Sequence, residues 1–167
     1  MSIENYKPDF LLSAAYQLGA ESLRRHGIRA VLVDLDNTLT AWNNPNGTPE
    51  MRAWLAEMKA THIKVIVVSN NKHDRVKRAV ARFDVPFVSR AMKPFDMGIK
   101  KALKVLGEKP EDAVMVGDQL MTDIRAAKRA GVRSVLVKPL VESDAWNTKF
   151  NRARERRVWR KLIEKYG

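Results

Sequence analysis

Short apolar runs alternate with longer amphipathic stretches along most of the chain. The runs predict buried strands, because they are continuously apolar and rich in β-branched residues; they occupy residues 30–33, 63–68, 85–88, 113–116 and 134–137. Capping residues, first-turn prolines and closing glycines predict helices between them; these occupy residues 49–61, 74–83, 94–106 and 122–130. Strands and helices that alternate at these lengths predict an α/β fold, a three-layer sandwich around a mostly parallel, five-stranded sheet.

The stretch before the first predicted strand has a broad apolar arc when its residues are placed at helical spacing. Asp9 provides a cap or a first-turn carboxylate, and Gly27 provides an end. We therefore expect an amphipathic helix over residues 8–26, with its apolar side packed on the sheet of the same domain.

The composition is that of a globular protein with one domain. The chain has 167 residues, of which 45% are apolar and 30% charged, and it contains no Cys, so disulfides and thiolate metal sites are excluded. It has no apolar run of about 18 residues, the length that a spanning helix needs. The first residues also lack the basic and then apolar pattern of a secretory signal. The expected location is the cytoplasm, with peripheral contact to the inner face of the membrane if lipid is the partner.

The positive charge is concentrated toward the carboxyl end. Residues 147–167 contain eight basic and two acidic residues, so they carry +6 of the net charge of +12. Such a charge favours anionic partners, namely anionic lipid, nucleic acid or a phosphorylated substrate. We predict a core over residues 1–146 and a basic helical tail over residues 147–167.

The end of this tail is predicted to be an amphipathic helix. Its basic residues face away from an apolar arc, which holds Val158, Trp159, Leu162, Ile163 and Tyr166. A Trp and basic residues around an apolar stripe are typical of a helix that lies on anionic lipid. Docking of the stripe on the domain itself or on a second copy of the chain, and binding to RNA, are the alternatives.

Two carboxylates follow the first predicted strand. Asp34 comes directly after the apolar run and Asp36 lies two residues further, so the geometry of a strand turns both side chains to the same side. Neighbouring carboxylates repel, and the pKa of one rises unless a cation neutralises them. The pair therefore indicates a site for a hard metal or an acid and nucleophile pair, and the alternative is an ordinary polar turn.

Polar residues also follow the other predicted strands. Because the carboxyl ends of parallel strands lie at one edge of the sheet, residues far apart in the sequence can meet there. Carboxylate oxygens suit Mg²⁺, and a lysine with hydroxyl groups suits a phosphoryl group. The residues that follow the strands are Asp34, Asp36 and Thr38, then Ser69 and Asn70, then Lys93, and finally Asp118 and Asp123.

The order of these residues resembles the four motifs of the haloacid dehalogenase (HAD) superfamily of phosphatases. More narrowly, the chain resembles the YqeG family of class IIIA phosphatases, which is similar to the mitochondrial phosphatidylglycerophosphate phosphatases of eukaryotes. The resemblance covers nearly the whole chain and implies a HAD-like Rossmannoid core. It rests on Asp34-Leu-Asp36-Asn-Thr38-Leu, Val68-Ser-Asn-Asn71, Lys93-Pro94, Gly117-Asp-Gln-Leu-Met-Thr-Asp123 and Thr148-Lys-Phe-Asn-Arg152.

The resemblance implies a role for each of these positions. Asp34 would be the nucleophile that forms an aspartyl-phosphate, and Asp36 would be the general acid and base. Lys93 would neutralise the charge of the nucleophile and of the phosphoryl group. The implied phosphate ligands are Thr38, Ser69 and Asn70. The implied ligands of Mg²⁺ are Asp34, the main-chain carbonyl of Asp36 and Asp118, with Asp123 acting indirectly or through a water molecule.

The spacing between the motifs leaves no room for a cap domain. Ser69 follows Asp34 by 35 residues and Lys93 follows Ser69 by 24, and predicted strands and helices already fill both intervals. A site without a cap is open, so its substrate can be a lipid head group, a nucleic-acid end or a protein. Neighbours in an oligomer can also cover such a site, so small phosphate esters stay open as substrates.

Together with these features, the resemblance implies a Mg²⁺-dependent phosphatase that acts through an aspartyl-phosphate. Among substrates, the resemblance points to phosphatidylglycerophosphate or a similar anionic lipid head group, and the open site and basic tail are compatible with it. One alternative is a soluble phosphatase of a small metabolite or of a nucleic-acid end. An alternative of another class is a non-catalytic, basic protein that associates with RNA or the ribosome, and its main support is the net charge of +12.

Overall fold

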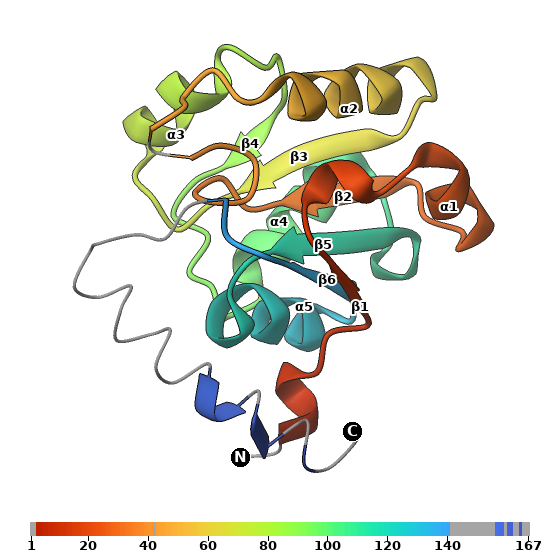
Figure 1. Ribbon diagram of the computed structural model, residues 1–167, viewed down its shortest axis with the longest axis vertical. Helices are drawn as coiled ribbons and strands as arrows, with labels where there is room; N and C mark the ends of the chain where they lie inside the picture. The colour runs from red at the N-terminus through yellow and green to blue at the C-terminus, as the bar shows by residue number, and fades with distance from the viewer. Residues whose placement is uncertain (1–2, 42, 141–155, 159, 162–163, 165–167) are drawn as a thin grey trace.

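The fold is built on one sheet of six parallel strands, in the order β1-β6-β5-β2-β3-β4 (Figure 1). The computed structural model describes residues 3–41, 43–140, 156–158, 160–161 and 164. β2 lies inside the sheet, with β5 on one side and β3 on the other. The strands are β1 (Phe10–Leu12), β2 (Ala30–Val33), β3 (Lys64–Val68), β4 (Phe87–Val88), β5 (Ala113–Gly117) and β6 (Arg133–Val137).

Helices cover both faces of the sheet (Figure 1). Apolar side chains of α1, α2 and α3 meet Val31 and Val33 of β2 on one face, and those of α4 and α5 meet Ala30 and Leu32 on the other. These four side chains alternate because successive residues of a strand point in opposite directions. The helices are α1 (Ala20–Arg25), α2 (Pro49–Ala60), α3 (His73–Val80), α4 (Met97–Leu106) and α5 (Arg125–Ala130), with shorter turns η1 (Ile3–Tyr6), η2 (Ala15–Gln17), η3 (Pro110–Asp112) and η4 (Leu120–Ile124).

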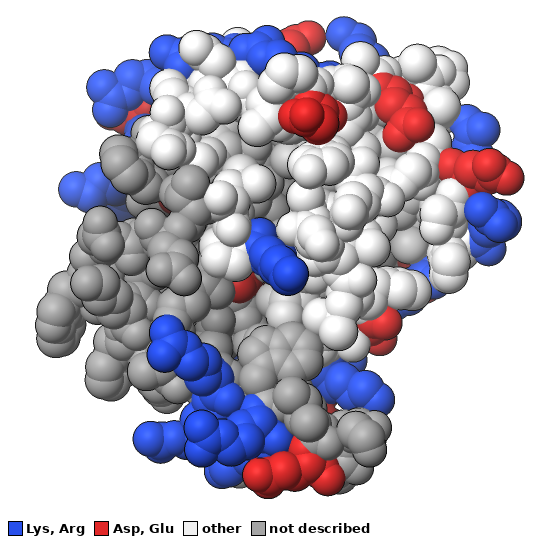
Figure 2. Space-filling view, viewed as in Figure 1, with Lys and Arg blue, Asp and Glu red and all other residues white. Residues whose placement is uncertain are grey.

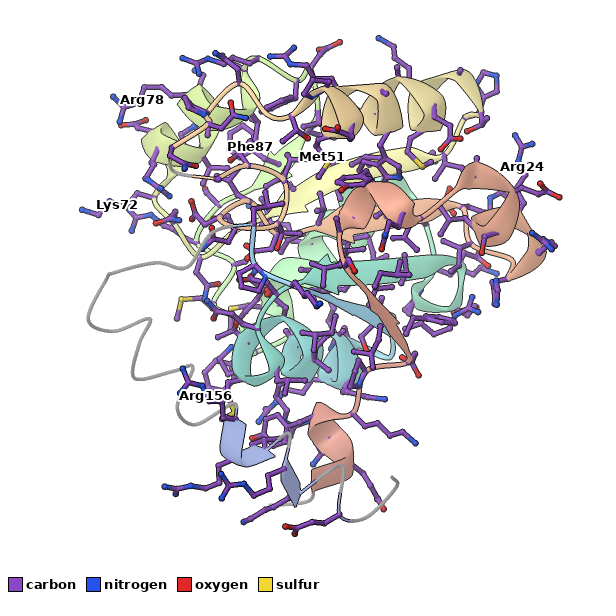
Figure 3. The ribbon with its side chains drawn as sticks, viewed as in Figure 1. Arg24, Met51, Lys72, Arg78, Phe87 and Arg156 are labelled. Atoms are coloured by element: carbon purple, nitrogen blue, oxygen red, sulfur yellow. The ribbon has the colours of Figure 1, made fainter. Side chains whose placement is uncertain are left out.

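The two cores explain the pattern of the sequence. All four residues of β2 are fully buried, which is why a strand covered on both faces is a continuous apolar run. Figure 3 shows the side chain of Met51 between α2 and the sheet, whereas Arg24 and Arg78 point outward. The charged residues of the amphipathic stretches therefore face away from the sheet.

The predicted α/β architecture is confirmed. Each strand and helix predicted between residues 30 and 137 is present, with bounds shifted by a few residues. Thr48 caps α2 as expected, since its side chain accepts a hydrogen bond from the N–H of Met51 (3.2 Å). α4 begins three residues later than predicted, because a turn precedes it, closed by a hydrogen bond of 2.8 Å from the N–H of Phe95 to the carbonyl oxygen of Met92.

The predicted helix over residues 8–26 is wrong. Phe10–Leu12 forms β1 and pairs in parallel with β6, and only Ala20–Arg25 becomes an α-helix. Without β1, the outer side of β6 would be a sheet edge with unpaired main-chain groups. Asp9 extends the pairing, since its carboxylate accepts a hydrogen bond from the N–H of Ser134 (2.8 Å). The sheet consequently has six strands rather than five.

The described residues contain no inserted cap domain, as predicted. A loop and α2 connect β2 to β3, and α3, β4 and a turn connect β3 to α4. Helices and strands of the sandwich itself account for both intervals between the motifs.

The predicted tail helix is partly described. Its residue Val158 packs against Leu120, Ile124 and Leu136, which belong to η4 and β6. This contact favours docking on the domain for that residue. The other residues of the predicted stripe lie outside the described residues: Trp159, Leu162, Ile163 and Tyr166.

Basic residues of the described tail segments face the solvent. Arg156, Arg157, Arg160 and Lys161 are exposed, and Figure 2 shows Lys and Arg side chains gathered at this end of the molecule. No helix in the described part of the chain is long and apolar enough to cross a membrane.

Candidate active site

The residues predicted to form the site come together at the carboxyl edge of the sheet. β2 lies between β3 and β5, so Asp34, Ser69 and Asp118, which follow these strands, share that edge. Most of the predicted side chains are buried although they are polar, and buried polar groups need partners. The buried members are Thr38, Ser69, Lys93, Asp118 and Asp123.

Lys93 lies at the centre of the buried charges. Its ammonium is 2.6 Å from Oδ1 of Asp123 and 3.0 Å from Oδ1 of Asp34, and its side chain is 3% exposed. Burial alone would lower the pKa of Lys93, but the two carboxylates outweigh burial and raise that pKa above its usual value. Lys93 is therefore a cation at neutral pH.

Asn70 holds the main chain of Lys93 in place. Its Nδ2 donates to the carbonyl oxygen of Lys93 (2.9 Å), and its Oδ1 accepts from the N–H of Lys93 (2.8 Å). The N–H of Ala91 also donates to the carbonyl oxygen of Ser69 (2.9 Å). The turn before α4 is thus fastened to the end of β3. The amide of Asn70 is engaged there, so the predicted phosphate contact of Asn70 would come from its main-chain N–H.

Asp34 is less buried than the other carboxylate that contacts Lys93. Its side chain is 13% exposed, compared with 0% for Asp123. Its Oδ1 also accepts a hydrogen bond from the N–H of Leu35 (2.9 Å). Burial raises the pKa of Asp34 well above its usual range, Asp123 and Asp118 add to the rise, and Lys93 opposes it. A further cation beside Asp34 would favour its ionised form.

Gly117 makes room for Asp123. A Cβ atom on Gly117 would lie 2.2 Å from Oδ2 of Asp123, far inside van der Waals contact. Asp123 is fully buried, and its Oδ2 accepts a hydrogen bond from the N–H of Gln119 (3.2 Å). Packing around this carboxylate thus requires the glycine at the end of β5, and a larger residue would displace Asp123 from Lys93.

Three carboxylates form a group that fits a metal ion. One oxygen from each of Asp34, Asp118 and Asp123 lies within 4.8 Å of the others. With the ammonium of Lys93 between two of them, three carboxylates and one cation leave a net charge of −2. A divalent cation would balance that charge, and carboxylate oxygens are ligands that Mg²⁺ prefers. The donor set therefore fits the predicted metal.

We expect Mg²⁺ to raise the melting temperature of the protein. A ligand that binds only the folded state stabilises it by about 2.7 kcal/mol at about a hundred times Kd. Because the pKa of Asp34 is raised, protons compete with the cation, and the gain should be larger at about pH 8 than at about pH 5.5. Thermal unfolding with Mg²⁺ or with chelator measures both effects. In Asp118→Asn most of the gain should disappear, and an equal gain there would contradict this ligand set.

Asp36 is turned toward α3. Nη1 of Arg75 donates to its Oδ2 (3.0 Å) and Nη2 donates to its Oδ1 (2.9 Å), and Nδ2 of Asn71 donates to Oδ2. The hydrogen bonds that Arg75 donates to Asp36 raise the pKa of Arg75. The side chain of Asp36 is 46% exposed. The residue predicted to be the acid and base is therefore held at the solvent-exposed rim of the site.

The sequence prediction missed Arg75 and Asn71. A signal for Arg75 was present, because it lies in the first turn of α3, where the helix dipole disfavours a cation. A carboxylate partner offsets that disadvantage. Asn71 directly follows Ser69 and Asn70, at a strand end where polar residues were already expected.

Thr38 and Ser69 are buried at the same edge of the sheet. Oγ1 of Thr38 donates to Oδ1 of Asp118 (3.4 Å), and Oγ of Ser69 accepts from the N–H of Asn71 (3.1 Å). Asn37, before Thr38, has a φ of 62°, a left-handed conformation that Asn adopts more readily than most residues. The chain therefore turns back after Asp36, which leads Thr38 into the site. Binding of phosphate by the two hydroxyl groups stays a prediction.

Comparison with known proteins identifies a family and several relatives of the chain. A family model described as haloacid dehalogenase-like hydrolase matches residues 3–131. The chain is 38% identical over 160 residues to a protein of Bacillus subtilis (strain 168) named "Probable phosphatase YqeG", and the match covers 96% of this chain and 93% of the relative. It is 29% identical over 133 residues to phosphatidylglycerophosphate phosphatase 1, chloroplastic/mitochondrial, of Arabidopsis thaliana, covering 74% of this chain and 38% of the relative.

Solved structures with a similar fold include two whose likeness to this chain concerns the fold alone. The cobalt-bound deoxy-D-mannose-octulosonate 8-phosphate phosphatase of Haemophilus influenzae superposes with a TM-score of 0.52 at 17% identity, over 68% of this chain and 80% of that one. NagD of E. coli K-12 superposes with a TM-score of 0.57 at 15% identity, over 70% of this chain and 90% of NagD. These likenesses support the fold, and the family model and the Bacillus relative extend the match to the sequence. The chain therefore belongs to the haloacid dehalogenase-like hydrolases, as a phosphatase of phosphoric monoesters.

Proposed function

We propose that the protein hydrolyses its substrate through an aspartyl-phosphate on Asp34. The observation that carries this proposal is the buried contact of 3.0 Å between Lys93 and Asp34, beside two further carboxylates. Two donors orient Oδ1 of Asp34, so Oδ2 is the oxygen that we assign to the attack. Phosphoryl transfer depends chiefly on placed charges of this kind, so the contact between Lys93 and Asp34 supports the proposal.

The reaction has two halves. In the first, Oδ2 of Asp34 forms a bond to phosphorus while the bond from phosphorus to the ester oxygen breaks, and Asp36 gives a proton to that leaving oxygen. In the second, water attacks phosphorus and gives a proton to Asp36, and the bond to Asp34 breaks to release inorganic phosphate. Lys93, Thr38 and Ser69 hold the phosphoryl oxygens. Bound Mg²⁺, held by the three carboxylates and the main-chain carbonyl of Asp36, would neutralise phosphoryl charge.

Replacement of Arg75 by Met is expected to lower kcat with little change in KM. Arg75 contacts Asp36 rather than the buried cluster, so its loss should act through the acid and base. A positioning residue should cost less than the about 10² to 10⁴-fold that an acid and base typically contributes, and we expect about 10- to 100-fold. Arg75→Lys keeps the charge but not the paired hydrogen bonds, so its kcat should lie between that of wild type and that of Arg75→Met. Steady-state kinetics across pH measure the effect.

Arg78→Met is the matched control for this prediction. Arg78 is an exposed residue of the same helix, and its side chain points outward (Figure 3). Wild-type kinetics are expected in this variant. An unchanged kcat in Arg75→Met, or the same loss in both variants, would contradict a role of Arg75 in positioning Asp36.

The substrate that we propose is phosphatidylglycerophosphate, or another lipid with a terminal phosphate. Similarity to the Arabidopsis relative that bears this substrate in its name supports the proposal. No inserted domain lies between the motifs in the described residues, so a bulky head group need not pass under a cap. The net charge of +12 attracts the protein to anionic surfaces.

A panel of phosphate esters with Mg²⁺ tests the substrate. It contains phosphatidylglycerophosphate in vesicles, glycerol 3-phosphate, an oligonucleotide with a terminal phosphate and an aryl phosphate. We expect kcat/KM to be at least about tenfold higher for the lipid, a difference of about 1.4 kcal/mol. A higher kcat/KM for the oligonucleotide or for glycerol 3-phosphate would reject the lipid as substrate but leave the assignment as a phosphatase intact. Salt-sensitive binding of RNA without hydrolysis of any ester would favour the non-catalytic alternative.

A further inference from the structure

The turn that carries Lys93 also exposes apolar side chains. Met92 is 54% exposed, Phe95 51% and Met97 58%, while Lys93 between them is buried. In the described part of the chain six large apolar side chains are exposed, and these three fall within six consecutive residues. Apolar side chains that gather at the surface indicate contact with a partner. We call residues 92–97 the apolar turn.

Hydrogen bonds and close packing give the apolar turn one shape. The N–H of Phe95 donates to the carbonyl oxygen of Met92 (2.8 Å), and the two hydrogen bonds from the end of β3 fasten the start of the turn. Beyond its end, a Cβ atom on Gly98 would lie 2.5 Å from Cβ of Ala91, so α4 packs tightly on the chain that leads into the turn. The main chain that carries the exposed side chains is therefore held in one conformation. The same turn contributes Lys93 to the active site.

Basic side chains surround the apolar turn. The guanidinium of Arg129 lies 5.3 Å from the centre of the Phe95 ring, and Lys100 pairs with Asp96 at 2.9 Å. Arg90, just before the turn, is exposed. These charged residues beside the apolar side chains are thus three cations and one carboxylate. This combination is typical of protein surfaces that lie on anionic lipid.

A lipid surface fits the apolar turn better than a protein partner does. A stable protein interface buries about 800 Å² on each side, which is far more than three side chains expose. Contact with the interface of a bilayer needs only a few apolar side chains with cations beside them. A phosphate that is fixed to a lipid also stays at the membrane surface, so the site must be brought to it.

We propose that the apolar turn is the surface by which the protein docks on an anionic bilayer. Met92, Phe95 and Met97 insert among the lipids, and the surrounding cations contact the head groups. Because Lys93 belongs to the same turn, docking places the phosphate of a neighbouring lipid near Asp34. This inference rests on the proposed function, in which the substrate is a phosphorylated lipid.

Sedimentation of the full chain with vesicles tests the docking surface. The variant is Phe95→Gln combined with Met97→Gln; Met92 stays, because its φ of 59° is left-handed and a substitution there could alter the turn. The control is Val105→Gln, which removes a 57% exposed side chain near the other end of α4. Wild type and control should bind phosphatidylcholine vesicles that contain phosphatidylglycerol, and the double variant should bind about tenfold less.

Activity separates the docking surface from the chemistry. All three proteins should hydrolyse a soluble aryl phosphate at rates within about twofold, since the replaced side chains are more than half exposed and none of them belongs to the buried cluster. Hydrolysis of phosphatidylglycerophosphate in vesicles should fall about tenfold in the double variant alone. All three proteins keep the predicted basic tail, residues 147–167, so a difference between variant and control is assigned to the apolar turn.

Three outcomes decide the proposal. Equal binding of the double variant and the control to anionic vesicles would overturn it. A dimer in solution that the double substitution dissociates would also overturn it, because the turn would then contact a second copy. A wild-type protein that binds the vesicles through the turn but leaves their lipid phosphate intact would keep the docking surface and reject the proposed substrate.

Discussion

Replacement of Asp34 by Asn is expected to abolish hydrolysis without loss of stability. Asn fills the same space but cannot form the aspartyl-phosphate, so kcat for an aryl phosphate with Mg²⁺ should fall by at least about 10³-fold. The substitution also removes one of three crowded carboxylates. A raised pKa means that the fold favours neutral Asp34. In chelator, neutral Asp34 therefore contributes to the stability of the wild type at low pH, and this contribution is lost as pH rises through the raised pKa. The melting temperature of Asp34→Asn in chelator should therefore exceed that of wild type, and the gain should grow with pH.

Asp84→Asn is the matched control for the nucleophile. The side chain of Asp84 is 93% exposed and lies 3.6 Å from Lys59 at the surface, so its replacement should change neither activity nor melting temperature. Activity of Asp34→Asn at the wild-type level would remove Asp34 as the nucleophile. A fall of activity and melting temperature together would mean that the variant had lost its fold rather than its chemistry.

Replacement of Lys93 by Met is expected to remove both activity and stability. The ammonium lies 2.6 Å from Asp123 and 3.0 Å from Asp34, and buried carboxylates left without their cation typically cost about 3–5 kcal/mol. Met keeps a long, flexible apolar side chain, so little of the loss should come from packing. Urea unfolding in chelator measures the free energy of unfolding, and hydrolysis of an aryl phosphate measures the chemistry.

A second substitution separates charge from packing in this prediction. Asp123→Asn, added to Lys93→Met, removes one of the uncompensated carboxylates and still offers an oxygen to the N–H of Gln119. The double variant should regain part of the lost stability and none of the activity. Compared with the two single variants, its free energy of unfolding gives the coupling energy between the two positions. Losses that simply add would show that the ion pair does not support the fold.

The parallel sandwich could be predicted because its strands leave a local pattern. β2, β3 and β5 are apolar along most of their length, since helices cover both of their faces. Once the strands are known to be parallel, their carboxyl ends must share an edge. Asp34, Ser69 and Asp118 could therefore be placed at one edge from the residues that follow each run.

The N-terminal stretch could not be predicted in this way. Residues 8–26 have apolar residues at spacings that fit a helix, and short apolar runs do not by themselves distinguish a strand from a helix. β6 decides the matter, because its outer edge provides main-chain partners for Phe10–Leu12. Those partners exist only after a segment more than 120 residues away has folded.

The sequence by itself determined the α/β fold and the residue types at the strand ends, because buried strands and the polar residues that follow them are local features. Only the tertiary structure decided which side chains meet there. Lys93 and Asp123 are 30 residues apart, and Arg75 and Asp36 are 39 apart. Each pair joins separate elements of the sandwich. Their contacts depend on how those elements pack, and no local pattern of apolar and polar residues records that packing.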